Sequence, residues 1–170
     1  ITSSTVSSGD TSNDASIALI FTSSEATTNF AVGDITVTGG TLSNFASSSS
    51  TVYTATFTAS SNGATSIDVA AGTYTDATGN SNTEATQFTW TMDAVPPTMV
   101  VTSSTVSNGA TSNDSTIALT FTSSEATTNF VESDITVSGG SLSDFVATST
   151  TVYTATFTPS SDGETTVCLL

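Results

Sequence analysis

A small set of oxygen-bearing side chains in this sequence has the chemistry of calcium ligands. Glu25 and Glu125 occupy equivalent places in a stretch, FTSSEATTNF, that occurs twice in the chain. Asp76 and Asn80 lie in the stretch YTDATGNSN, and Asp93 comes shortly before a pair of prolines. Calcium takes about six to eight oxygen ligands from carboxylates, amides and carbonyls. These residues are therefore candidate metal ligands.

The overall composition favours the binding of a cation from solution. The chain contains 15 Asp and Glu residues but no Lys, Arg or His, so its formal net charge is -15. Carboxylates that lie close together have no cationic side chain to offset their repulsion, which favours a bound metal ion. Nothing in the chain can neutralise phosphate, which excludes nucleic acids and anionic membrane surfaces as partners. Most acid–base and nucleophilic catalysis is also excluded, and we predict that the protein is not an enzyme.

An ordinary loop is the alternative for each candidate ligand. The sequence DATGN is typical of a turn in which the Asp side chain accepts hydrogen bonds from its own backbone. Glu25 can equally be a solvated loop charge, and the spacing does not match that of an EF-hand loop. The residues alone leave both interpretations open.

The two copies of FTSSEATTNF belong to a longer tandem repeat. Residues 1–64 align with residues 101–164 without a gap, and most paired positions are identical. A period of about 100 residues is the size of a small globular domain and too long for a solenoid unit. We therefore expect two domains, at 1–93 and 99–170, joined by a Pro-rich linker at 94–98.

Alternating apolar residues predict that both domains are built from β-strands. Clusters of Gly, Asn, Asp and Ser separate the alternating segments and predict turns, including one over 38–44. About seven or eight short strands in a hundred residues are typical of an all-β sandwich, with a barrel as the alternative. In the first repeat the segments with this alternation are 16–22, 34–37, 51–58, 65–74 and 86–93.

The second repeat has no counterpart of residues 71–93. Its last residues, SSDGETTVCLL, align with SSNGATSIDVA, and Val167 and Leu169 keep the apolar phase of Ile67 and Val69. A sandwich without its last strand exposes its core and a strand edge. Three hypotheses follow: the sequence is part of a longer protein, a neighbouring chain supplies the strand, or the second domain is weakly stable by itself.

Several stretches together resemble the bacterial Ig-like repeats of giant secreted adhesins and cell-surface proteins. They are IALTFTSSE, DITVSGG, YTATFTPS, YTDATGNSNTEATQFTWTMD and PPT, and the resemblance covers the full chain. It implies tandem Ig-like β-sandwiches, extracellular display and frequent calcium near domain junctions. The final residues, CLL, depart from the family pattern.

An Ig-like topology would also bring the candidate ligands together. The loop with Glu25 and the loop with Asp76 and Asn80 would share one end of the first sandwich. The linker would enter the second sandwich at the equivalent end, so that Asp93 arrives next to Glu125. A calcium ion bridging Asp93 and Glu125 would then stiffen the junction between the repeats.

These observations favour a structural function. We expect a spacer or stalk module of a long extracellular repeat protein, either a surface adhesin or a filament. Its partners would be neighbouring Ig-like repeats of the same or adjacent chains, without insertion into a membrane. The alternatives are a module that binds ligands such as glycans, and a filament subunit assembled by strand donation between chains. A carboxylate-based hydrolase is least favoured, because no pocket-forming insertion interrupts the repeat.

Overall fold

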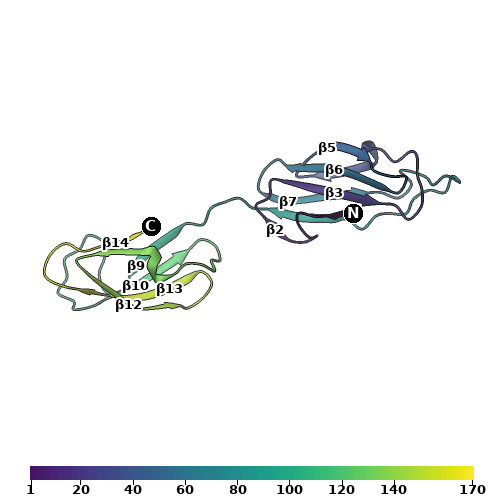
Figure 1. Cartoon of the computed structure of the whole chain (residues 1–170). Coiled ribbons are helices and arrows are strands. Elements are labelled where there is room, and N and C mark those ends of the chain that lie inside the picture. Colours follow the sequence, from purple (N-terminus) through teal and green to yellow (C-terminus); the bar gives the residue numbers. More distant parts are fainter. The chain divides into compact units, whose positions relative to one another are not determined.

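The computed structural model describes all residues, 1–170, and contains two compact units, Ile1–Val95 and Pro96–Leu170. The division between them falls within the segment 94–98 that the prolines mark as a linker. Strands dominate both units (Figure 1). The helices are two short 3-10 turns, η1 (Val32–Asp34) and η2 (Glu132–Asp134). None of the helical segments has the length and apolarity needed to cross a membrane.

Unit 1 is a β-sandwich of two four-stranded sheets, as the sequence predicts. One sheet has the strand order β1-β3-β6-β5 and the other the order β2-β8-β7-β4. Buried side chains from both sheets join in one apolar cluster, which is the core of the sandwich. The strands are β1 (Thr2–Ser3), β2 (Thr11–Ser12), β3 (Ser16–Thr22), β4 (Ile35–Thr38), β5 (Gly40–Ser47), β6 (Val52–Ala59), β7 (Gly63–Val69) and β8 (Phe88–Met92).

The inward faces follow the predicted alternation. In β6 the side chains of Tyr53, Ala55 and Phe57 are buried, while the Thr residues between them are more exposed. The ring of Trp90 in β8 meets the ring of Phe57 edge to face, with centroids 5.6 Å apart. Trp90 and Phe57 thus connect the two sheets through the centre of the core.

Strand β5 was not expected from the sequence, which predicts a turn over 38–44. The structure places β5 at the edge of the first sheet, where it pairs with β6. Its register shifts between Ser43 and Ala46, and Asn44 between them has a φ of 53°. This bulge puts Leu42 and Phe45 on the same face at a spacing of three residues. The apolar residues of β5 therefore do not recur at every second position, and the alternation does not predict the strand.

Two predicted strand boundaries also differ. The segment predicted at 65–74 ends at Val69, because the chain turns there and Gly72 adopts a φ of 77°. Asp34 precedes β4 instead of opening it: its carboxylate accepts a hydrogen bond from the Ala31 N–H at 2.8 Å and caps η1. Both differences come from turn geometry, which the apolar pattern does not encode.

Unit 2 repeats the first sheet of unit 1 but has a smaller second sheet. The order β12-β13-β10-β9 matches the first sheet, whereas the second contains only β11 and β14. Cys168 lies in β14 as an exposed free thiol. The strands are β9 (Met99–Ser103), β10 (Ile117–Ser123), β11 (Ile135–Ser138), β12 (Gly140–Ala147), β13 (Val152–Pro159) and β14 (Thr166–Leu169).

The pair Gly39–Gly40 allows β5 to start against the core. Gly39 has a φ of 74°, and a Cβ on Gly40 would lie 2.4 Å from Cζ of Phe57 and 2.3 Å from the Thr58 carbonyl oxygen. The Phe57 ring therefore occupies the space of the missing side chain. Gly140 and Phe157 repeat this contact in unit 2.

We predict that Gly40→Ala destabilises unit 1 by about 1–3 kcal/mol, because the added methyl group must displace a buried ring and a strand carbonyl. Denaturant unfolding followed by the fluorescence of Trp90 measures this, since Trp90 is the single Trp and reports on unit 1 alone. Gly33→Ala is the control, because a Cβ there meets no atom within 4 Å. Equal unfolding midpoints for the two variants would contradict the role of Gly40.

Candidate functional site

Asp76 organises the loop between β7 and β8. Its Oδ1 accepts hydrogen bonds from the N–H groups of Thr78 and Asn80, at 2.9 and 2.8 Å. The Asn80 side-chain amide donates to Oδ2 at 2.8 Å, and the Thr78 hydroxyl lies 2.9 Å from both oxygens. The turn interpretation of DATGN is therefore realised in the structure, with the carboxylate as its central acceptor.

These hydrogen bonds hold the pKa of the Asp76 carboxyl well below its usual range. The largest cause is the hydrogen bond from the Asn80 side chain, followed by the one from the Asn80 N–H, and Thr78 adds further donors. Each donor favours the ionised carboxylate over the protonated acid.

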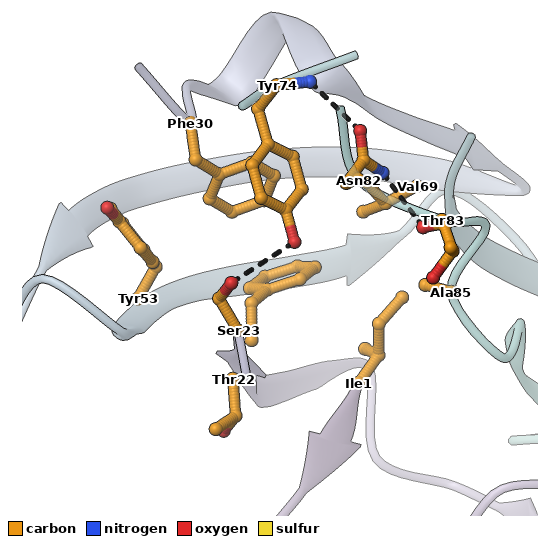
Figure 2. Close-up of a pocket in the computed structure, with 11 residues that line it drawn as sticks. Ile1, Thr22, Ser23, Phe30, Tyr53, Val69, Tyr74, Asn82, Thr83 and Ala85 are labelled. Atoms are coloured by element: carbon orange, nitrogen blue, oxygen red, sulfur yellow. Dashed lines mark hydrogen bonds between the residues drawn. The ribbon is translucent and has the colours of Figure 1, made fainter. Parts of the chain in front are cut away.

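Asn82 closes the same loop at its base. Its Oδ1 accepts hydrogen bonds from the N–H groups of Thr73 and Tyr74, at 2.9 and 3.0 Å. Its Nδ2 donates to the carbonyls of Ala70 and Thr83, at 2.8 and 2.9 Å (Figure 2). All four hydrogen-bonding positions of this amide are thus used inside the protein.

The loop after β3 contacts this loop, as an Ig-like topology predicts. Oδ1 of Asn29 accepts a hydrogen bond from the Thr75 N–H at 3.1 Å, and Nδ2 of Asn29 donates to the Thr75 hydroxyl at 3.2 Å. The Tyr74 hydroxyl donates to Ser23 at 3.4 Å (Figure 2). Glu25 lies in the same loop, but it is exposed and makes no hydrogen bond. Asn29 is therefore the bridging residue, and the sequence analysis missed it.

The repeated stretch FTSSEATTNF has a packing role in both units. Thr27 is buried, and its carbonyl accepts a hydrogen bond from the Tyr53 hydroxyl at 2.9 Å. The Phe30 ring lies 5.0 Å from each of the rings of Tyr53 and Tyr74. In unit 2 the ring of Phe130 meets its tyrosine in the same way, at 4.9 Å. In unit 1 Thr27 and Phe30 are buried while Glu25 is exposed, and in unit 2 Phe130 keeps the ring contact although it is only half-buried.

The hollows of unit 1 are small or open. The crevice in Figure 2 has a volume of about 50 Å³ and lies among Phe21, Phe30, Tyr53 and Tyr74. This is room for a few water molecules, whereas sites for small organic ligands have about 300–1,000 Å³. A second hollow of about 330 Å³ is open to solvent, and Thr and Ser residues of neighbouring strands form most of its wall.

Glu125 and Asp93 lie in different units. Glu125 is half-buried, and the preceding residue, Ser124, donates its N–H to the Thr98 carbonyl at 2.8 Å. The linker therefore enters unit 2 beside the loop that carries Glu125. Asp93 belongs to unit 1, where its carboxylate accepts a hydrogen bond from the Val95 N–H at 3.1 Å. A metal ion bridging Asp93 and Glu125 stays a prediction.

The side-chain oxygens of the 74–82 loop are arranged to accept hydrogen bonds within the loop rather than to surround a metal ion. The oxygens of Asp76 and Asn82 are already acceptors for several N–H groups, and Asn80 offers Asp76 its amide nitrogen. The structure contains no group of three or more Asp, Glu, His or Cys side chains arranged to hold one ion. Calcium binding by Glu25, Asp76 or Asn80 therefore has no support from these contacts and stays a prediction.

The chain has two β-sandwiches in tandem, and the same packed loop follows β3 in unit 1 and β10 in unit 2. This arrangement is typical of the class of Ig-like modules. A family model described as "Bacterial Ig-like domain" matches residues 2–91 and again residues 93–169. The chain therefore belongs to the bacterial Ig-like domain family, and each match covers one repeat. Searches of curated proteins and of solved structures gave no match.

We predict that the Asp76 carboxylate stabilises unit 1 in a pH-dependent way. The pKa of Asp76 is lowered in the folded state from its usual value of 3.8. Its contribution is therefore fully present above that value and is lost as the pH falls through the folded-state pKa. Asp76→Asn should lower the thermal midpoint of unit 1 at pH 7, and the difference from the unchanged protein should shrink towards pH 2.

Glu84→Gln is the matched control for Asp76→Asn. It removes the same charge from an exposed side chain that makes no hydrogen bond. A midpoint difference that does not depend on pH, or an equal effect of Glu84→Gln, would contradict the role of the Asp76 hydrogen bonds.

Proposed function

We propose that the chain is a spacer module of an extracellular surface protein, in which bacterial Ig-like sandwiches follow one another and set the distance between other parts. The observation that carries the proposal is the tandem repetition of one sandwich around a short linker. Modules of this family are typically structural and displayed outside the cell. The lack of Lys, Arg and His agrees with a structural function, since it leaves little catalytic chemistry.

The linker is tied to the unit at each of its ends. The Ala94 N–H donates to Oδ1 of Asn62 at 3.1 Å, inside unit 1. The Thr98 N–H donates to the Ser124 hydroxyl at 2.9 Å, inside unit 2. Pro96 and Pro97 lie between these anchors, and each proline ring fixes its backbone φ angle near about −65°. A linker with so few free torsions suits a spacer that must keep its length.

Ligand or glycan binding has less support as the main function. Sites that bind sugars or other ligands through stacking need an exposed aromatic ring. The exposed large apolar residues are aliphatic: Val32, Val95, Val100, Val131, Val146, Leu169 and Leu170. The aromatic side chains are packed in the two cores, where they stabilise the sandwiches.

The spacer proposal predicts that the prolines restrict the motion between units. Replacing Pro96 and Pro97 by Gly should broaden the distribution of inter-unit distances, because Gly removes the fixed φ angles. Single-molecule energy transfer between dyes on Cys168 and on an added cysteine, Thr41→Cys, measures this distribution, and both positions are exposed. The unfolding midpoint by Trp90 fluorescence should stay unchanged. Identical distance distributions would contradict a stiffening role of the prolines.

Calcium binding by the 74–82 loop is a second, more specific part of the proposal. If the 74–82 loop binds calcium with the Kd of about 10⁻⁴ M found in extracellular modules, 10 mM calcium at about 100 times Kd adds about 2.7 kcal/mol. That should raise the thermal midpoint of unit 1 by on the order of 10 °C over the chelator-treated protein. Asp76→Ala should abolish the rise, and magnesium at equal ionic strength controls for charge screening. An equal rise with magnesium would contradict a calcium site.

A further inference from the structure

The side chain of Asn62 ties the start of the linker to unit 1. Asn62 lies in the connection 60–62, through which the chain passes from β6 in the first sheet to β7 in the second. Its Oδ1 accepts a hydrogen bond from the Ala94 N–H at 3.1 Å. The next N–H along the chain, that of Val95, bonds to the nearby Asp93 carboxylate and so adds no contact with the rest of unit 1. Asn62 therefore makes the last hydrogen bond between unit 1 and the linker.

Asn62 is followed by Gly63, and these two residues can react with each other. The backbone nitrogen of Gly63 attacks Cγ of Asn62 and closes a five-membered succinimide ring, while the side-chain NH2 takes up the Gly63 proton and leaves as ammonia. Water then opens the ring at one of its two carbonyls, which gives an aspartate or, more abundantly, an isoaspartate. One water is consumed and one ammonia is released, so no enzyme or cofactor is needed. Glycine favours the attack because no Cβ crowds its nitrogen.

Both reacting groups are accessible in unit 1. Asn62 and Gly63 are exposed, and a Cβ on Gly63 would meet no atom within 4 Å, so the space beside it is open. Gly63 is the first residue of β7, and the end of a strand opens more readily than its middle. The Asn62 Nδ2 donates no hydrogen bond within the protein, so ammonia leaves directly into solvent.

The Ala94 N–H also assists the reaction. Negative charge develops on Oδ1 of Asn62 when the Gly63 nitrogen attacks Cγ. The Ala94 N–H already lies 3.1 Å from this oxygen and stabilises the charge, as the donors of an oxyanion hole do. The hydrogen bond that anchors the linker thus also promotes the conversion of the side chain that accepts it.

We propose that Asn62 and Gly63 form a self-modifying site whose reaction detaches the linker from unit 1. Isoaspartate has one additional CH2 in the backbone between positions 62 and 63, which moves the acceptor away from Ala94. Its negative carboxylate lies beside Asp93, because Gly63 pairs with Met92, and no cationic side chain offsets the repulsion. The chemistry does not depend on the proposed spacer function, whereas its effect on the spacing of the units rests on it.

The sequence of unit 2 indicates that the sandwich tolerates the product. Asp162 takes the place of Asn62 and is also followed by a glycine, Gly163. A carboxylate in this connection is therefore compatible with the fold of the first sheet, which both units share. We expect the reaction to change the linker and to leave unit 1 folded.

Ageing of the full chain in a mildly alkaline buffer tests the modification. The aged chain is digested with pepsin, since it contains no Lys or Arg for trypsin to cleave, and the peptides are analysed by mass spectrometry. The peptide with Asn62 should exchange NH2 for OH and should accept a methyl group from an isoaspartyl methyltransferase. Asn108, the other asparagine that is followed by glycine, is the reference for reaction under the same conditions.

Two variants separate assisted reaction from simple exposure. Ala94→Pro removes the assisting N–H and should slow the reaction at Asn62 about tenfold, while the reaction at Asn108 keeps its rate. This is less than the loss of such a donor costs in a closed active site, because Asn62 is exposed to water. Asn62→Gln is the inert control, since its ring would have six members and closes far more slowly, and its amide still offers an acceptor.

The effect on the linker is measured on the same aged samples. Dyes on Cys168 and on Thr41→Cys report the distances between the units by single-molecule energy transfer. The distribution of distances should broaden in proportion to the fraction of modified Asn62. It should stay unchanged while the Asn62→Gln chain is aged in the same way.

Two results would overturn the proposal. One is an unmodified Asn62 in chains whose Asn108 has reacted, which would show that unit 1 protects the pair. The other is an unchanged distance distribution in chains modified at Asn62, which would show that the anchor does not depend on this side chain. A failure of the spacer function is distinguishable from both, because the distribution would already be broad in fresh chains.

Discussion

Two aromatic side chains on the inward face of β6 connect the separate parts of unit 1. Tyr53 holds the loop after β3, through its hydroxyl bond to that loop and its ring contact with Phe30. Phe57 covers the glycine that starts β5 and meets Trp90 of the opposite sheet. The edge strand, the loop and the second sheet are thus positioned from one central strand. Strand β13 repeats most of these contacts, and its Phe157 lacks only the partner from the opposite sheet.

The absence of cationic side chains limits how this protein can use its carboxylates. Asp34 caps a turn by accepting a backbone N–H, and Asp134 does the same in unit 2. Asp76 gathers an amide, a hydroxyl and two N–H groups. The donors around Asp76 are neutral groups, so the ionisation of the Asp76 carboxyl is what makes these contacts depend on pH. Abundant Ser, Thr and Asn supply the donors that Lys and Arg supply in other proteins.

The sandwich could be predicted from the sequence wherever the alternation was regular. Strand β6 is an example, because its apolar residues recur at every second position. Strand β5 was missed because Asn44, with its left-handed backbone, changes the spacing of the apolar residues on either side of it. The pattern of apolar residues carries no information about such a bulge. The turn built by Asp76 and Asn80 could be predicted because its partners are four residues apart. Asn29 could not, because its partner Thr75 lies 46 positions away and only the folded chain brings the two together.

The bulge in the edge strand affects how this edge can meet a strand of another molecule. Asn44 in β5 and Asp144 in β12 interrupt the row of backbone groups on the outer edge of the first sheet in each unit. A neighbouring strand that approached this edge would meet a kinked, polar and partly charged border, which opposes edge-to-edge aggregation. The irregular edge of β5 and of β12 therefore opposes strand pairing between copies of the chain at this place.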